Sequence, residues 1–66
     1  MKAPNEKPEV KLVGADGNAF SVMGLVAKAL KRAGADKEYV DKYMAEAMAG
    51  DYDHLLQVTI GYVEVS

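Results

Sequence analysis

Apolar residues recur with a helical period along most of the chain after residue 18. In residues 19–33 they stand three and four positions apart, with a second apolar row beside them. The two rows are Phe20, Met23, Ala27 and Leu30, and Val22, Val26, Ala29 and Ala33. Because an α-helix has 3.6 residues per turn, these side chains share one broad face. The pattern predicts a central helix over residues 19–33, with Gly34 just past its end.

Two more helices are predicted, each after an aspartate that can cap it. The second helix follows Asp36 and ends near Gly50, and the third follows Asp51. Their apolar series are Val40, Tyr43, Met44, Ala47 and Met48 in the second, and Tyr52, Leu55, Leu56, Thr59, Ile60 and Val63 in the third. Residues 58–65 are rich in β-branched side chains, so the tail 63–65 has two alternatives, continued helix or short strand.

The N-terminal part has a different pattern. Residues 1–8 contain two prolines and alternating charges, which predicts a disordered arm, with residues 9–66 as a single small domain. Residues 9–13 alternate charged and apolar side chains, as a half-buried strand does, and Asp16 or Asn18 can cap the helix that follows. We therefore expect a mostly α, compact three-helix domain. Pairing of the N-terminal strand with the C-terminal tail would make it a small α+β fold.

Gly24 is a local exception inside the first predicted helix. Glycine in a helix interior costs up to about 1 kcal/mol relative to alanine. We interpret Gly24 as a sign that another helix or a partner approaches the backbone closely at this position.

Composition restricts the chemistry. The 66 residues include one histidine, no cysteine and no tryptophan, so neither a disulfide nor a cysteine zinc site can form. No apolar run has the length of a membrane span, and residues 1–9 lack the apolar core of a signal peptide. We expect a cytoplasmic protein that is not an enzyme, with no catalytic residues, no cofactor, no metal and no membrane contact.

The acidic stretch around the histidine contains the residue types of a metal or acid–base site. Asp51, Asp53 and His54 bring two carboxylates and an imidazole within four residues. At the start of a helix, however, these side chains point in different directions, and aspartate there is favoured by the free amides and the helix dipole. Helix capping is the preferred interpretation.

Charge is distributed unevenly along the chain. Residues 1–33 carry six basic and three acidic side chains, and residues 34–66 carry two basic and seven acidic. We expect the two halves to pair within the molecule. The alternative is a basic face for one partner, and its compact part is Lys28, Lys31 and Arg32. A nucleic-acid-associated accessory protein that uses these residues, at the end of the first helix, is the alternative function, disfavoured by the net charge of −2.

The leading functional hint is the second predicted helix. Tyr39, Tyr43 and Met48 belong to its apolar stripe, and tyrosine and methionine are enriched at protein interfaces. The other interpretation is that they fill an irregular small core. We expect a protein-binding or self-associating module without catalytic activity, with a protein partner or a second copy of the chain bound at this stripe.

Two stretches also carry a resemblance. The segments KLVGADGNAF at residues 11–20 and GDYDHLLQ at residues 50–57 resemble motifs of a group of short bacterial and phage-encoded proteins. The resemblance covers most of residues 11–63. It implies a bacterial or phage source, but the group has no assigned activity, so it implies no functional residues.

Overall fold

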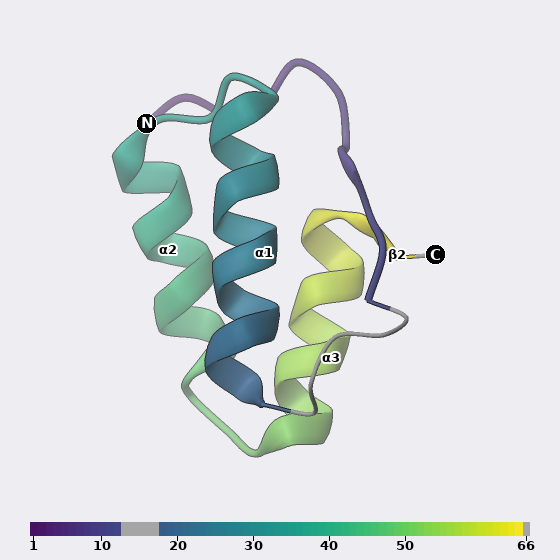
Figure 1. Ribbon diagram of the computed structural model, residues 1–66. Helices are drawn as coiled ribbons and strands as arrows, with labels where there is room; N and C mark the ends of the chain where they lie inside the picture. Colours follow the sequence, from purple (N-terminus) through teal and green to yellow (C-terminus); the bar gives the residue numbers. More distant parts are fainter. Residues whose placement is uncertain (13–17, 66) are drawn as a thin grey trace.

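The computed structural model describes residues 1–12 and 18–65. In this part of the chain, three helices and two very short strands form one layered unit (Figure 1). They are, in order, β1 (Glu9–Val10), α1 (Ala19–Arg32), α2 (Lys37–Ala47), α3 (Tyr52–Tyr62) and β2 (Glu64–Val65). The predicted three-helix fold is confirmed. Asp16, the other residue predicted to cap the first helix, lies outside the described residues, as does Val13 at the end of the predicted N-terminal strand.

The C-terminal tail forms a strand rather than a continuation of α3. Val63 leaves the helix in an extended conformation, and β2 then runs parallel to β1, with Val10 opposite Val65. The Glu64 amide also donates a hydrogen bond to the Pro8 carbonyl, at 2.8 Å. The predicted pairing of the two ends of the domain is therefore confirmed, which makes the fold a small α+β unit.

Each helix begins at a polar cap. Asn18 accepts a hydrogen bond from the Phe20 amide, Asp36 from the Tyr39 amide, and Asp51 from the His54 amide. These side chains satisfy amides that have no partner within the helix. The capping prediction for Asp36 and Asp51 is confirmed, and for α1 the cap is Asn18.

The turn between α1 and α2 has the two hydrogen bonds of a Schellman motif. The Gly34 amide donates to the Lys31 carbonyl at 3.1 Å, and the Ala35 amide donates to the Leu30 carbonyl at 3.0 Å. Gly34 has a φ of 104°, a backbone conformation that residues other than glycine rarely adopt. Ala35 and Leu30 are both buried, as is common in this motif, so this turn also extends the core.

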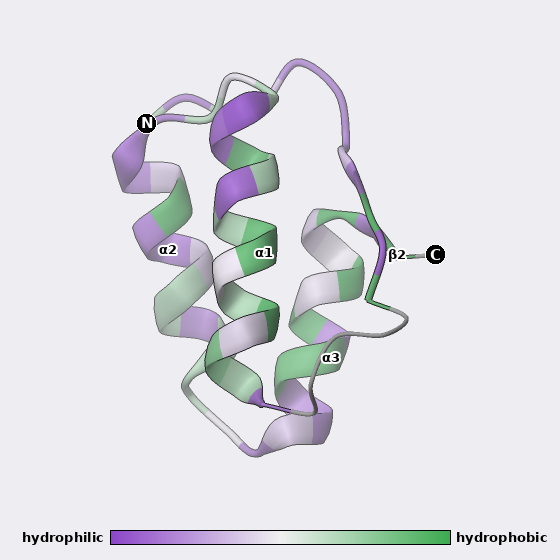
Figure 2. Ribbon diagram, in the orientation of Figure 1, coloured by the Kyte–Doolittle hydropathy of each residue, from purple (hydrophilic) through white to green (hydrophobic). Residues whose placement is uncertain are grey.

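The core lies between the three helices and the strand pair. It consists of Val10, Val22, Met23, Val26, Leu30, Ala35, Val40, Tyr43, Ala47, Leu55 and Val63. Figure 2 shows the most hydrophobic ribbon segments of α1 turned toward α3. Thr59 is buried among these residues, and its hydroxyl lies 2.8 Å from the Tyr43 hydroxyl. The two hydroxyl groups therefore form a hydrogen bond with each other, and neither is left without a partner in the core.

Four residues predicted to lie on buried faces are instead exposed. Phe20 is 73% exposed, Met48 58%, Ile60 57% and Tyr52 40%. All four stand at the margin or the end of an apolar stripe, and a bundle of three short helices has no further layer to cover them. The approach of another helix to Gly24 is also absent, because a Cβ atom there would meet no described atom within 4 Å.

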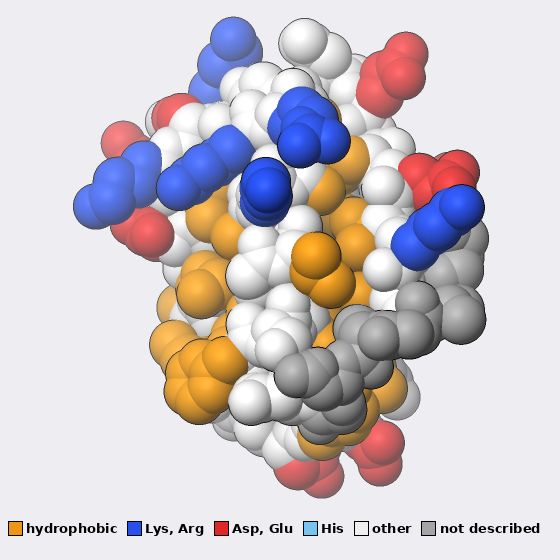
Figure 3. All heavy atoms as spheres, viewed as in Figure 1, with side chains coloured by type: hydrophobic (Ala, Val, Ile, Leu, Met, Phe, Trp, Pro, Cys, Tyr) orange, Lys and Arg blue, Asp and Glu red, His pale blue; other side chains and the backbone are white. Residues whose placement is uncertain are grey.

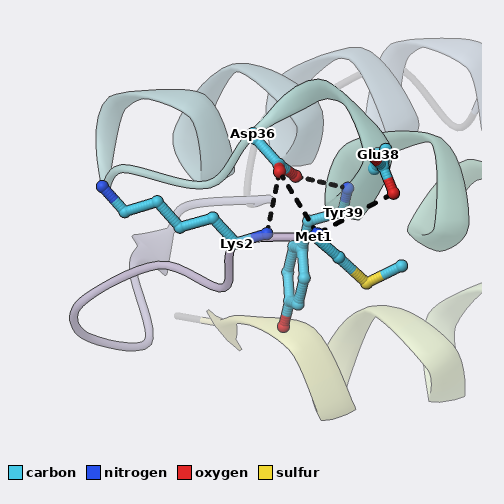
Figure 4. Close-up of polar contacts among 5 residues, drawn as sticks. All are labelled: Met1, Lys2, Asp36, Glu38 and Tyr39. Carbon is cyan, nitrogen blue, oxygen red and sulfur yellow. Dashed lines mark hydrogen bonds and ion pairs between the residues drawn. The ribbon is translucent and has the colours of Figure 1, made fainter.

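Residues 1–8 lie across the turn between α1 and α2. The backbone of Lys2 exchanges hydrogen bonds with Asp36, and the Asn5 amide donates to the Ala33 carbonyl at 3.1 Å. The amino group of Met1 lies 3.8 Å from carboxylate oxygens of Asp36 and Glu38 (Figure 4). The disorder of this arm stays a prediction, but the structure gives the arm a defined place on the domain.

Candidate functional site

One end of the bundle carries the largest exposed apolar side chains that lie close together. Phe20, Met48 and Tyr52 surround a hollow of about 220 Å³, and we name these three residues the apolar end. Beneath them, the hollow is lined by the buried residues Met23, Ala47 and Leu55. Tyr52 is 40% exposed, so all three members of the apolar end present hydrophobic surface to solvent.

The chain path explains why these residues meet. α1 begins, α2 ends and α3 begins at the same end of the bundle, the lower end in Figure 1. Phe20 and Tyr52 lie in the first turns of α1 and α3, and Met48 is the residue that ends α2. Side chains in a helix tilt toward its N-terminus, so those in a first turn extend past the helix end. The hollow is thus formed by three helix ends.

Charge is unequal along the long direction of the molecule. Figure 3 shows lysine and arginine side chains gathered over the upper half, with acidic side chains beside them, whereas the described side chains visible at the lower margin are hydrophobic or acidic. Lys28, Lys31 and Arg32 are exposed, and within the described residues none of them forms an ion pair. Among the described residues that line the hollow of the apolar end, Asp51 alone is charged.

Tyr39, Tyr43 and Met48, predicted to form one partner-binding stripe, do not form one exposed surface in the structure. Tyr43 is fully buried, so it offers a partner no surface in this fold. Tyr39 is partly buried against Tyr62, with ring centroids 5.5 Å apart. Met48 alone of the three lies at the apolar end. Burial raises the pKa of Tyr43, and its hydrogen bond to Thr59 partly offsets that rise, so the hydroxyl stays neutral and keeps its core role.

Phe20 and Tyr52 are members of the apolar end that the helical pattern assigned to the core. Their position in the helix, rather than their residue type, distinguishes them from the residues that are buried. Each comes within two residues of a helix cap, Asn18 or Asp51, where little of the helix lies N-terminal to cover the side chain. Residues 19 and 20, which end the first of the two motif-like stretches, line this hollow together with Gly50, Asp51 and Leu55 of the second.

A second hollow lies between α2 and α3, and we name it the α2–α3 groove. It has a volume of about 430 Å³ and is lined by Glu46, Ala49, His54, Gln57, Val58, Gly61 and Tyr62. The His54 Nε2 atom lies 2.9 Å from the Glu46 carbonyl oxygen. Since a carbonyl oxygen only accepts, Nε2 carries the hydrogen and donates it. In the neutral ring, Nδ1 is then a free acceptor.

Glu46 also binds Tyr62 across this groove. The Tyr62 hydroxyl donates a hydrogen bond to the Glu46 carboxylate. Burial raises the pKa of Tyr62, and the Glu46 hydrogen bond and negative charge raise it further. The phenol is therefore a neutral donor that fixes the carboxylate of Glu46 between the two helices.

Asp51, Asp53 and His54 do not form a joint site. Asp51 caps α3, Asp53 lies in its first turn, and the ring of His54 is hydrogen-bonded to α2. Within residues 1–12 and 18–65, no three histidine or carboxylate side chains are grouped so that they could hold a metal ion.

Comparisons with protein-family models, with curated proteins and with solved structures find no match to the chain. The resemblance to short bacterial and phage proteins therefore stays a hypothesis. Among the described helices, none has both the length and the apolar character needed to cross a membrane.

Proposed function

We propose that the chain is a small protein-binding module without catalytic activity, and that the apolar end is its contact surface. The observation that carries this proposal is the exposure of Phe20 and Met48 around one hollow. Complete burial of a large apolar side chain contributes about 1.5–3 kcal/mol. A partner that covers both side chains gains that free energy, whereas the free chain leaves them in water.

The size of the hollow favours a polypeptide as the occupant. Small-molecule pockets usually measure about 300–1,000 Å³, and the hollow at the apolar end measures about 220 Å³. This volume suits one protruding apolar side chain from a partner. Met48 adds adaptability, because methionine is unbranched and adjusts to irregular surfaces.

Charge favours a different polypeptide over a second copy. Asp51 lines the hollow, and in the described chain no lysine or arginine lines it with Asp51. A two-fold dimer across the apolar end brings the Asp51 residues of both copies together, which is unfavourable. We therefore commit to a partner segment that carries an apolar side chain with basic residues beside it. We place this binding in the cytoplasm.

Binding is tested with amphipathic helical peptides that differ only beside the apolar face, where they carry lysine, glutamine or glutamate. We expect the lysine peptide to bind best and to shift the amide NMR signals of Met23, Ala47 and Leu55. A Phe20→Ser, Met48→Gln variant should lose this binding. Ile60→Ser, an equally exposed change outside the apolar end, should keep it.

Two outcomes would contradict this proposal. One is equal binding of the lysine and glutamate peptides, or binding that survives the double substitution. The other is a dimer in sedimentation equilibrium that Phe20→Ser, Met48→Gln abolishes, which would make a second copy the occupant. We expect a 7.1 kDa monomer at micromolar concentrations.

A nucleic-acid-associated function is the second candidate. It is favoured by Lys28, Lys31 and Arg32 on the outward face of α1, which are exposed and form no ion pair with any described residue. Neutralising phosphates with such cations releases counterions, so binding would fall steeply with added salt.

A further inference from the structure

The α2–α3 groove contains polar atoms of Glu46 and His54, and a helical glycine, Gly61, that packing of the fold does not explain. We propose that it binds the arginine side chain of a polypeptide segment that crosses α3 at Gly61. This site lies on the other side of the α2–α3 turn from the hollow at the apolar end, and the two hollows share no lining residue. The proposal therefore does not depend on the function proposed for the apolar end.

Gly61 indicates where a ligand approaches. It lies inside α3, where alanine is favoured over glycine by about 1 kcal/mol. Its φ is not positive, and a Cβ atom there would meet no described atom within 4 Å. Neither backbone conformation nor packing thus requires glycine at this position. Gly61 differs from Gly24 in that it lines the groove, where a Cβ atom would limit how closely a ligand can approach the backbone of α3.

The polar atoms of the groove indicate the chemistry of that group. Of the described residues that line it, Glu46 alone carries a formal charge, and the charge is negative. With Nε2 of His54 donating to the Glu46 carbonyl, the atoms left for a ligand are chiefly acceptors: the Glu46 carboxylate and His54 Nδ1. A ligand that matches them presents several donors and a positive charge, as a guanidinium group does.

The apolar part of the groove fits the stem of the same side chain. Val58 and the ring of Tyr62 are partly buried in its lining. Tyr62 is held in place by the Glu46 hydrogen bond and by an edge-on contact with the Tyr43 ring, 5.1 Å between centroids. An arginine buries its methylene stem on apolar surface and stacks its planar guanidinium group on aromatic rings. The ammonium group of lysine is not planar and stacks on such rings less well.

The binding experiment uses a blocked heptapeptide of alanine and serine with one central arginine, which has no large apolar side chain for the apolar end to bind. Matched peptides carry citrulline, which is neutral and of the same shape, or glutamate. We expect the arginine peptide to shift the amide NMR signals of His54, Gln57 and Gly61. The citrulline peptide should bind several-fold more weakly, and the glutamate peptide should not bind.

Substitutions then separate binding from folding. Gly61→Ala should raise the melting temperature, because alanine is favoured over glycine in a helix. It should also lower the affinity for the arginine peptide about tenfold, since an added methyl group in a filled contact costs on that order. Gly24→Ala is the matched control, because Gly24 is also exposed within a helix with nothing near its Cβ position, but lies outside the groove. It should raise the melting temperature equally and leave binding unchanged.

Glu46→Gln tests the charge. Glutamine can still accept the Tyr62 hydrogen bond, so the fold should be kept. The arginine peptide should lose up to about fivefold in affinity and most of its salt dependence. Equal binding of the arginine and citrulline peptides would overturn the proposal, and so would Gly61→Ala binding as well as Gly24→Ala. Phe20→Ser should not affect this peptide, which keeps the two sites distinguishable.

Discussion

Tyr43 and Thr59 make the one described side-chain hydrogen bond that is fully inside the core. Both residues are completely buried, and their hydroxyl oxygens lie 2.8 Å apart. No described buried side-chain nitrogen or oxygen atom lacks a partner. A buried hydroxyl without a partner costs about 1–3 kcal/mol, so each of these residues depends on the other.

Substitution of one member should therefore cost more than substitution of both. We expect Tyr43→Phe to lower the free energy of unfolding by about 1–3 kcal/mol, because the Thr59 hydroxyl stays buried alone. Adding Thr59→Val, which has nearly the same shape, should recover much of that loss. Urea denaturation of the two single variants and the double variant measures the coupling. Simple additivity of the losses would show that the hydroxyls do not stabilise one another.

Residue type and spacing predicted the buried side of each helix but not its margins. Tyr43, Leu55 and Thr59 stand in the middle of their predicted stripes, and all are buried. Phe20 and Ile60 stand at stripe margins and are exposed. A periodic pattern gives the direction of a side chain around the helix, but burial also requires a neighbouring element, whose place the pattern does not contain.

At the scale of elements, the helix starts were the most predictable features. A cap is a local interaction between one side chain and amides two or three residues away, so the sequence contains all of its partners. The strand pair is the opposite case. Glu64 and Val65 extend because Glu9 and Val10 lie beside them, and that pairing joins residues 55 apart in the chain. The sequence indicated it only as an alternative to continued helix.

The two aspartate caps differ in how much structure depends on them. Asp51 caps α3 alone, whereas Asp36 caps α2 and also accepts a hydrogen bond from the Lys2 amide at 2.8 Å (Figure 4). We expect Asp51→Ala to lower the free energy of unfolding by about 1 kcal/mol, and Asp36→Ala to lower it more, because residues 1–5 lose their anchor as well. Urea denaturation measures both losses.

The control for the caps is Asp41→Ala. Asp41 pairs only with Lys37 on the exposed face of α2, at 3.7 Å, and such pairs contribute less than about 0.5 kcal/mol. The capping interpretation is wrong if Asp51→Ala changes stability no more than Asp41→Ala does. That result would reopen a functional role for Asp51 and its neighbours.

At the scale of the whole molecule, the charge difference between the halves of the chain is not matched by ion pairs between them. Among the described residues, no lysine or arginine of residues 1–33 forms an ion pair with a carboxylate of residues 34–66. The expected pairing between halves is limited to the amino group of Met1 with Asp36 and Glu38. Most of the basic side chains are therefore left in solvent, at the opposite end from the apolar end (Figure 3).

This arrangement makes nucleic-acid binding a direct test between the two candidate functions. Lys28, Lys31 and Arg32 give α1 a local positive field, but the chain carries ten acidic side chains and a net charge of −2. At about 0.15 M salt, exposed charges act over about 8 Å, so only the field of α1 itself would attract a phosphate backbone. If this patch did serve nucleic acid, its three cations would release few counterions, so binding would be weak and would disappear near physiological salt.

We expect no shift of labelled DNA or RNA by the parent chain, even at low salt, and the same result for a Lys28→Glu, Arg32→Glu variant. That variant should stay folded, because both side chains are exposed and unpaired in the described structure. Circular dichroism confirms its fold before binding is measured. Micromolar binding by the parent that falls with salt and is lost in the variant would reverse the order of the two functions. The outward face of α1 would then be the principal site, and the apolar end would need another explanation.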